Sequence, residues 1–272
     1  ILSRLIRAVR LSSSRRSLCS IGTEDYPFLG AAVPPQSDTD GQSASLPSVT
    51  TVLDRTRPPE SAIALARWLR KKQEALGPEG FARYRAGLLS AGTQLHRSIW
   101  SYLESGDAQP EAEVAGFFQS VLPILRSVES VQSQEALVVH QQLGYKGRLD
   151  CLARLRPDEG DVNSGRQRPE LLIEWKTAHE RKIAGLKDAY DAPLQLASYL
   201  GALNQMRRCC HGNEDSLPPV DSAILVYAYP DGSPAACLRL GVDQLLPAWS
   251  AWLHRLRAFQ LAQDRAAAKL TR

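Results

Sequence analysis

The segments Gly147-Arg-Leu-Asp-Cys-Leu-Ala-Arg-Leu155 and Glu170-Leu-Leu-Ile-Glu-Trp-Lys-Thr177 decide the fold of this chain. Both are short, rich in apolar residues and bounded by Gly147, a polar insert and Thr177, a pattern typical of buried β-strands. We expect these two strands to pair. Because side chains alternate between the faces of a strand, Glu174 and Lys176 should share one face, while Trp175 points into the opposite layer.

Pairing of the two strands predicts a cluster of charged groups at their centre. Asp150 lies among apolar residues, where a carboxylate is costly unless it is paired or binds a metal. If Asp150 faces Glu174 and Lys176, two carboxylates and one ammonium group share a small patch. Carboxylate oxygens suit Mg²⁺ or Mn²⁺. We therefore expect Asp150 and Glu174 to bind Mg²⁺, with Mn²⁺ as a substitute, and Lys176 to act in phosphodiester hydrolysis. The alternative is that Glu174 and Lys176 form only a solvent-facing salt bridge.

Residues outside the two strands add to this cluster. Gly92-Thr-Gln-Leu-His96 lies in a helical pattern, where His96 is either a metal ligand or a buried core histidine. Gln195 and Tyr199 are four residues apart, so they share one face of a predicted helix. They could bind substrate phosphate, support the ligands or be ordinary helix residues. Within the first strand, Arg148 lies two residues before Asp150. It is either a contact to a nucleic-acid backbone or a solvated surface arginine.

The order of these patterns resembles the RecB-like branch of the PD-(D/E)XK nuclease superfamily. The shared elements are Gly-x-x-x-His, an aspartate, Glu-x-Lys and Gln-x-x-x-Tyr, and the likeness covers roughly residues 46 to 260. Two departures are Leu149, where the superfamily name expects proline, and the insert at residues 156–168. Neither removes a functional group.

The resemblance implies an α/β fold of the restriction-endonuclease-like kind, with a central mixed β-sheet flanked by helices and an N-terminal helical cap. It also implies a metal-dependent exonuclease that trims free ends and flaps of single-stranded DNA in mitochondrial DNA replication, repair and maintenance. In such enzymes the backbone carbonyl after the acidic residue, here that of Trp175, also binds metal. The resemblance further suggests a monomer with a functional link to the mitochondrial DNA replication machinery. Two alternatives stay open: a catalytically idle nucleic-acid-binding nucleoid protein, and an RNA-directed nuclease of the same fold.

Residues 1–23 are expected to be a mitochondrial transit peptide, which places the protein in the mitochondrial matrix. Five arginines precede the first acidic residue, Glu24, and residues 1–16 wind into an amphipathic helix with its arginines on one side. A basic arm that contacts DNA is the alternative. Residues 24–45, rich in Pro, Ser and Asp, should be a disordered linker, and residues 46–272 should form the nuclease domain.

Composition narrows the classes of partner. The 33 basic and 29 acidic residues give a net charge of +4, but without the five N-terminal arginines 28 basic residues face 29 acidic ones, or about −1. Nucleic-acid binding would therefore depend on a local groove and bound metal. No apolar run approaches the roughly 18 to 20 residues of a membrane span, so we expect no membrane contact. The five cysteines contain no C-x-x-C pair and favour neither a disulfide framework nor a zinc site.

Hydrophobic periodicity predicts the remaining elements. Helices are expected over residues 61–75, 79–104, 111–128, 193–206 and 242–270, and strands over 136–142, 148–155, 170–176, 221–229 and 235–240. Ser61 is expected to cap the first helix, and residues 231–234 to form a hairpin turn.

Overall fold

The computed structural model describes residues 28, 46–156, 168–179, 183–210 and 217–270. The predicted transit peptide, residues 1–23, lies outside the described residues. So does the predicted linker, residues 24–45, except for Phe28, whose ring is buried 6.0 Å from that of Trp249.

A five-stranded mixed sheet forms the centre of the described part of the chain. Its order is β1-β2-β3-β4-β5, with parallel pairing only between β3 and β4. The strands are β1 Val128–His140, β2 Tyr145–Leu155, β3 Leu171–Thr177, β4 Ala223–Ala228 and β5 Ala236–Leu240. The expected α/β class with a mixed sheet is thereby confirmed.

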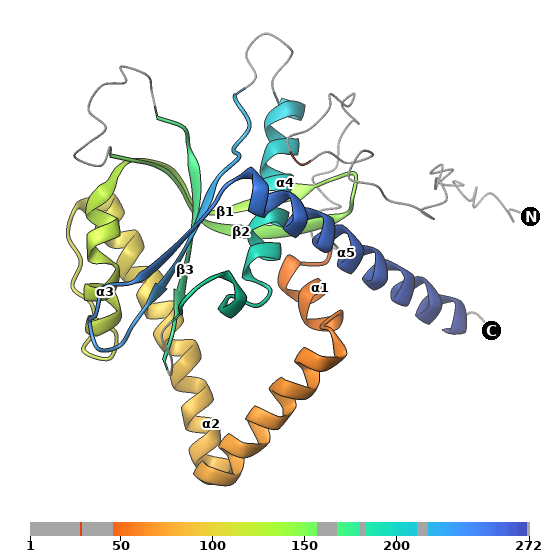
Figure 1. Ribbon diagram of the computed structural model, residues 1–272, viewed down its shortest axis with the longest axis horizontal. Helices are drawn as coiled ribbons and strands as arrows, with labels where there is room; N and C mark the ends of the chain where they lie inside the picture. The colour runs from red at the N-terminus through yellow and green to blue at the C-terminus, as the bar shows by residue number, and fades with distance from the viewer. Residues whose placement is uncertain (1–27, 29–45, 157–167, 180–182, 211–216, 271–272) are drawn as a thin grey trace, which may run out of the picture.

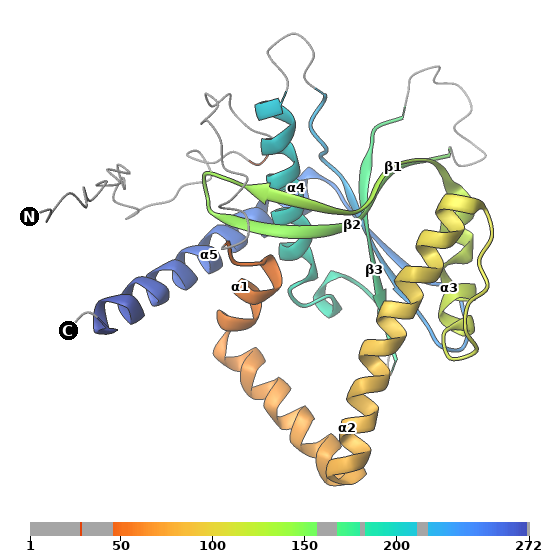
Figure 2. The same ribbon diagram turned by 180° about the vertical axis from the view of Figure 1, so that it is seen from behind.

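Helices cover both faces of this sheet (Figures 1 and 2). They are α1 Val49–Arg55, α2 Pro59–Ser105, α3 Ala115–Ser127, the 3-10 helix η2 Leu186–Asp188, α4 Ala192–Cys210 and α5 Val242–Leu270. One buried cluster joins α4 and α5 to one sheet face, and a second joins α3 and the end of α2 to the other. None of the helices in the described ranges combines the length and the apolar composition needed to cross a bilayer.

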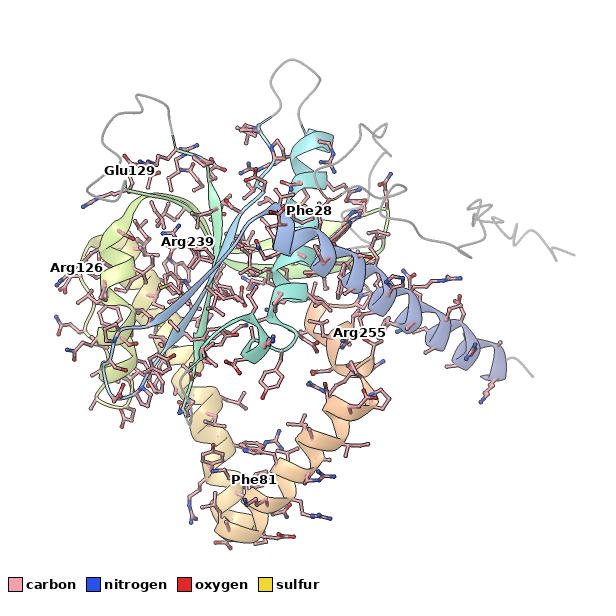
Figure 3. All side chains as sticks on the ribbon, in the orientation of Figure 1. Phe28, Phe81, Arg126, Glu129, Arg239 and Arg255 are labelled. Atoms are coloured by element: carbon pink, nitrogen blue, oxygen red, sulfur yellow. The ribbon has the colours of Figure 1, made fainter. Side chains whose placement is uncertain are left out.

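Helix α2 is bent into a V (Figure 1). Gly77 leaves the helical conformation, with φ 69° and ψ 168°, and Pro78 follows it. Glycine adopts positive φ without steric cost, and proline favours the first turn of a new helix. The two helices expected from the sequence are therefore the two limbs of α2, with Phe81 near the apex of the V (Figure 3). Ser61 is not the cap, because α2 begins at Pro59.

Two elements differ from the expectations. Helix α1 was not predicted; it begins after Ser48, whose Oγ accepts a hydrogen bond from the Thr51 backbone N–H, and it buries Val49, Val52 and Leu53. Strand β1 starts at Val128 instead of residue 136. Its first half is polar and only partly buried, so it lacks the apolar alternation on which the prediction depended.

The alternation of side chains in β3 places the site. Trp175 belongs to the same buried cluster as Leu95 and Phe117 on the α2–α3 side, whereas Leu172 belongs to the cluster of Leu196 on the α4 side. Glu174 and Lys176 have the parity of Leu172, so they face α4. The expected division of β3 between two layers is confirmed.

Candidate metal centre

The centre of the site is a place where two strands separate. Strand β2 pairs with β3 only over Cys151 to Ala153, and this antiparallel register sets Asp150 opposite Glu174. The backbone N–H of Trp175, one residue past Glu174, donates to Asp150 Oδ2 at 2.9 Å. A side-chain carboxylate thus occupies the position of the missing strand partner, which fixes Asp150 between the two strands.

His96 reaches this point from the C-terminal limb of α2. Its Nε2 lies 3.2 Å from the Trp175 carbonyl oxygen, and its Nδ1 lies 3.2 Å from Glu135 Oε1 and 3.7 Å from Asp150 Oδ1. Burial alone would lower the pKa of His96, but the negative charges of Asp150 and Glu135 outweigh burial and raise it. The potential ligand atoms of His96, Glu135 and Asp150 all lie within 4.8 Å of one another.

A hydrogen-bonded chain of four side chains lies on the other side of Glu174. Glu174 Oε1 accepts from Lys176 Nζ at 2.7 Å and from Gln195 Nε2 at 2.8 Å. Gln195 Oε1 in turn accepts from Lys176 Nζ at 3.0 Å, and Gln195 Nε2 also lies 2.8 Å from Tyr199 Oη. Burial would lower the pKa of Lys176, yet the charge of Glu174 outweighs it and raises that pKa, so the ammonium form is stabilised.

The described residues do not fully compensate the buried carboxylates Asp150 and Glu174. Burial and the charge of Glu174 raise the pKa of Asp150 to about 8. Glu174 is 2% exposed, and its Oε2 atom has no hydrogen-bond partner among the described residues. A buried carboxylate oxygen without a partner is costly, and a cation would remove that cost. Three carboxylates, one imidazole and one carbonyl form a donor set suited to a hard divalent cation.

Known proteins resemble most of the chain. Mitochondrial genome maintenance exonuclease 1 of Xenopus tropicalis is 35% identical over 226 residues, which are 82% of this chain and 59% of the relative. The Mus musculus protein of that name is 34% identical over 80% of this chain and 60% of the relative, and the Homo sapiens protein 31% identical over 79% and 58%.

The chain is a homologue of mitochondrial genome maintenance exonuclease 1.

This homologue spans about three fifths of the length of the curated exonucleases it matches. No protein-family model matches it. Among solved structures, the crystal structure of SSO0001 shares 18% identity over 75% of this chain and 74% of that one, but a TM-score of 0.28 is too low for a structural argument.

The fold brings together most of the residues that the sequence singled out. Glu174, Lys176 and Gln195 are hydrogen-bonded to one another, and Tyr199 joins them through Gln195. Asp150 is held beside them by its hydrogen bond from the Trp175 backbone N–H. His96 and the Trp175 carbonyl complete the group. Arg148 lies at its rim: this exposed side chain donates to the Glu135 backbone carbonyl at 2.7 Å, and it forms no bond with the carboxylates among the described residues.

Glu135 is the candidate ligand that sequence reasoning missed. It stands between Gln134 and Ala136, which pair with Cys151 and Leu149, so the register sets it opposite Asp150. Its φ of 48° is in the left-handed region, an uncommon and strained conformation for a non-glycine residue that often marks functional sites. No short sequence pattern marks this position, because the first half of β1 is polar; the observed His140–Tyr145 pair, counted back antiparallel, places residue 135 across from residue 150.

Proposed function

We propose that this chain is a metal-dependent exonuclease that degrades single-stranded DNA from free ends, and that its core is a PD-(D/E)XK nuclease domain spanning residues 46–272. The observation that carries the proposal is the buried Glu174 Oε2 atom, which lacks a partner among the described residues beside the His96, Glu135 and Asp150 cluster. Homology to exonucleases of mitochondrial genome maintenance supports the reaction class.

The acidic side of the site holds the metal in this proposal. Asp150 and Glu174 supply carboxylate oxygens, His96 an imidazole nitrogen and Trp175 its carbonyl oxygen, with Glu135 as a further ligand. Mg²⁺ is the expected ion, and Mn²⁺ its substitute. A bound Mg²⁺ ion would acidify a water molecule and neutralise charge on the scissile phosphate.

The polar chain on the α4 side positions Lys176 in this proposal. Glu174 and Gln195 hold the Lys176 ammonium group beside the carboxylates, where it donates to the attacking water or to the charge that develops on phosphate. Tyr199 orients Gln195, and we propose that the two support the ligands or the substrate phosphate. Arg148 contacts the nucleic-acid backbone from the rim. In this account Asp150, Glu174 and Lys176 are the catalytic residues.

The V of α2 accounts for a requirement for free ends. Its N-terminal limb is almost entirely exposed and stands apart from the sheet, while its C-terminal limb carries His96 (Figure 2). We propose that α1 and the V form the helical cap through which a single strand threads to the metal. Duplex DNA and closed circles are then poor substrates. The protein acts as a monomer, which gel filtration with light scattering tests.

Digestion of labelled nucleic acids tests the activity. The purified protein, freed of metal by chelation, is incubated with linear single-stranded DNA labelled at either end, circular single-stranded DNA, blunt duplex and RNA, with and without Mg²⁺. We expect only linear single-stranded DNA with Mg²⁺ to be degraded. Asp150→Asn should abolish degradation, whereas Asp243→Asn, on the exposed start of α5, should not. Cutting of the circle contradicts an exonuclease, cutting of RNA alone supports an RNA-directed nuclease, and binding without cutting supports the idle nucleoid protein.

The cellular place of the reaction is part of the proposal. We propose the mitochondrial matrix, with a role in trimming ends and flaps of mitochondrial DNA alongside the replication machinery, because the relatives are named for mitochondrial genome maintenance. Residues 1–23 would be the transit peptide. A fluorescent protein fused to residues 1–40 should enter mitochondria, and a diffuse cytosolic signal contradicts the assignment.

A further inference from the structure

A groove of about 620 Å³ adjoins the metal centre on the side away from α4. It is lined by the C-terminal limb of α2 and by Glu135 of β1 and Arg148 of β2. His96 and Glu135 line this groove and also belong to the metal cluster. Whatever occupies the groove therefore touches two of the side chains that would hold the metal. We call it the outer groove.

The other side chains of the outer groove are of two kinds. Leu89 and Trp100 are apolar and strongly exposed, at 73% and 47%. Arg97 and Arg148 are cationic, and neither is paired with a carboxylate within the described ranges. An exposed apolar surface beside two guanidinium groups that lack a carboxylate partner among the described residues matches a planar ring attached to an anion.

We propose that the outer groove binds the base and sugar of the nucleotide next to the scissile phosphate, with Trp100 stacking on the base. This inference rests on the proposed nuclease function and adds the residues that recognise the substrate. A base can stack on Trp100 only if it leaves its own base stack and its pairing partner, which is easy in a single strand and costly in a duplex. The groove thus selects single strands at the reaction site itself, in addition to any selection by the V of α2.

The glycine at position 92 independently indicates that a ligand occupies the outer groove. This glycine lines the groove one turn before His96, inside α2, where glycine is less favourable than alanine. A Cβ atom built on Gly92 meets no atom within 4 Å, so packing within the described protein does not require glycine there. A side chain at this position would instead project into the groove. If a ligand occupies that space, a larger residue would collide with it, and this explains why the residue is glycine.

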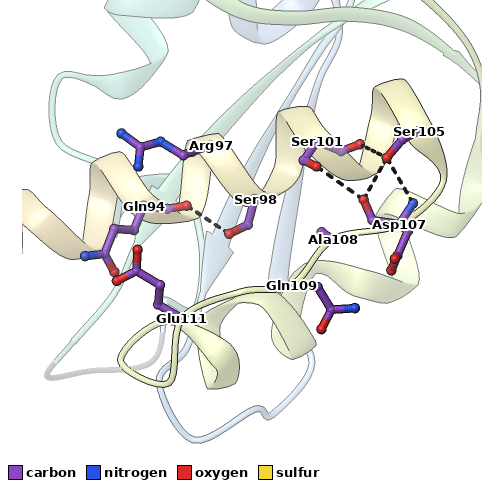
Figure 4. A pocket seen from close by; sticks show the side chains of 9 residues that line it. All are labelled: Gln94, Arg97, Ser98, Ser101, Ser105, Asp107, Ala108, Gln109 and Glu111. Carbon is purple, nitrogen blue, oxygen red and sulfur yellow. Dashed lines mark hydrogen bonds between the residues drawn. The ribbon is translucent and has the colours of Figure 1, made fainter.

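A second hollow shows what an ordinary polar pocket looks like in this chain (Figure 4). It lies on the other side of Arg97, between the end of α2 and residues 106–114. Its three serines already donate to backbone carbonyls: Ser98 to Gln94, and Ser101 and Ser105 to Asp107. Its acidic residues, Asp107 and Glu111, would repel phosphate. The outer groove combines two arginines and one glutamate with exposed apolar side chains, whereas the second hollow has one arginine and two acidic residues, and this difference favours the outer groove as the nucleotide site.

Abasic DNA provides the test. Linear single strands carrying one abasic residue at successive positions, and matched strands without it, are digested under single-turnover conditions by the wild-type protein, Trp100→Ala and Leu246→Ala. Leu246, 41% exposed on α5, is the matched control. We expect wild type and Leu246→Ala to slow roughly ten- to hundredfold at the one step where the abasic residue reaches the groove, the scale of one base-stacking contact. Trp100→Ala should be slowed by a similar factor on ordinary DNA, with little further loss on abasic DNA.

The outcomes separate this inference from the nuclease proposal. If abasic DNA is digested without a pause, or if the losses from Trp100→Ala and from the abasic residue multiply, the groove does not bind the base. If the wild type digests no DNA with any divalent metal, the nuclease proposal fails, and fluorescence anisotropy with the same two strands then decides whether Trp100 contacts a base. Gly92→Ala gives a second reading: its Tm should equal or exceed that of the wild type while cleavage falls. Unchanged cleavage in Gly92→Ala would contradict an occupant at that position.

Discussion

The ring of Tyr199 fills the space that a side chain on Gly147 would need. A Cβ atom built on Gly147 would come within 2.3 Å of Tyr199 Cε1 and 2.6 Å of Cδ1. Strand β2 and helix α4 therefore meet in close contact, and this contact holds the Tyr199 hydroxyl 2.8 Å from Gln195 Nε2. The glycine three residues before Asp150 thus positions the polar chain that ends at Lys176.

Gly147→Ala should displace Tyr199 and loosen that chain. We expect a loss of about 1–3 kcal/mol in the free energy of unfolding, as for other overpacked sites, and slower cleavage. Gly87→Ala is the control, because a Cβ there meets nothing within 4 Å. Urea unfolding measures both. The double variant Gly147→Ala with Tyr199→Ala should recover stability relative to the sum of the single changes, and strict additivity would rule out the contact as the cause.

Glu135 should show opposite effects on stability and metal binding. Its φ of 48° is strained for an L-residue with a Cβ, so Glu135→Gly should raise the free energy of unfolding by about 1 kcal/mol. The same change removes a carboxylate from the cluster, so Mn²⁺ affinity measured by calorimetry should fall. Tyr190 has a φ of 49° and is 75% exposed, so Tyr190→Gly should stabilise the protein with Mn²⁺ affinity unchanged. Equal Mn²⁺ affinity in wild type and Glu135→Gly would remove Glu135 from the ligand set.

His140, which is not one of the candidate ligands, should make the free energy of unfolding depend on pH. Burial lowers the pKa of His140 to about 3, and the charge of Arg208 acts in the same direction. The unfolded chain, with a histidine pKa near 6.5, then binds more protons than the folded protein between about pH 6.5 and 3. The contribution of His140 to the free energy of unfolding is therefore complete above pH 6.5, and it decreases as the pH falls from 6.5 to 3. His140 contributes up to about 1.4 kcal/mol per pH unit to this fall.

His140→Asn tests that contribution by denaturant unfolding at pH 7.0, 6.0 and 5.0, above the range where most carboxylates titrate. Asparagine keeps an acceptor for the Leu143 backbone N–H that His140 Nδ1 accepts at 3.3 Å. The variant should be less stable at pH 7 because it leaves space beside Tyr145 and Trp249. Its stability should change less with pH than that of the wild type, and parallel pH profiles would exclude His140 as the source.

The sequence predicted those parts of the site that depend on short patterns within one element or on the pairing of two adjacent strands. Short apolar-rich runs predicted β2 and β3, and their pairing placed Asp150 against Glu174. The four-residue spacing of Gln195 and Tyr199 predicted one helix face, which is the face that meets Lys176. These relations depend on neighbours along one element or on adjacent strands, so sequence alone carries them.

Other features depend on contacts that no short pattern records. The first half of β1 is polar, and pairing with β2 rather than burial makes it a strand, so the position of Glu135 was not predicted. The contact of Gly147 with Tyr199 joins residues 52 positions apart through α4 packing. The sequence predicted two helices, over residues 61–75 and 79–104, but the separation of these two limbs of α2 depends on where α1 and the sheet hold their ends.

Substitutions of Asp150 and Lys176 should separate metal binding from catalysis at the centre of the site. Asp150→Asn keeps an oxygen that can accept from the Trp175 N–H, so the strands should stay in place, but it removes an anionic ligand. Mn²⁺ affinity and cleavage should therefore fall together. Lys176→Ala removes a cation whose Nζ lies 2.7 Å from Glu174 Oε1, so Mn²⁺ affinity should be equal to or tighter than that of the wild type.

Cleavage by Lys176→Ala should nevertheless fall by about a hundredfold or more, the scale of losing one preorganised charge-stabilising group. Strand affinity should persist, because phosphate contacts along a groove depend little on any single lysine. Calorimetry measures the Mn²⁺ affinity of each variant, and single-turnover assays on the same preparations measure the cleavage rate. Thermal unfolding verifies that the variants are folded. If Lys176→Ala cuts at the wild-type rate, Lys176 has no part in the reaction. Its bond to Glu174 is then a structural salt bridge, and the water must be activated by the acidic side of the site alone.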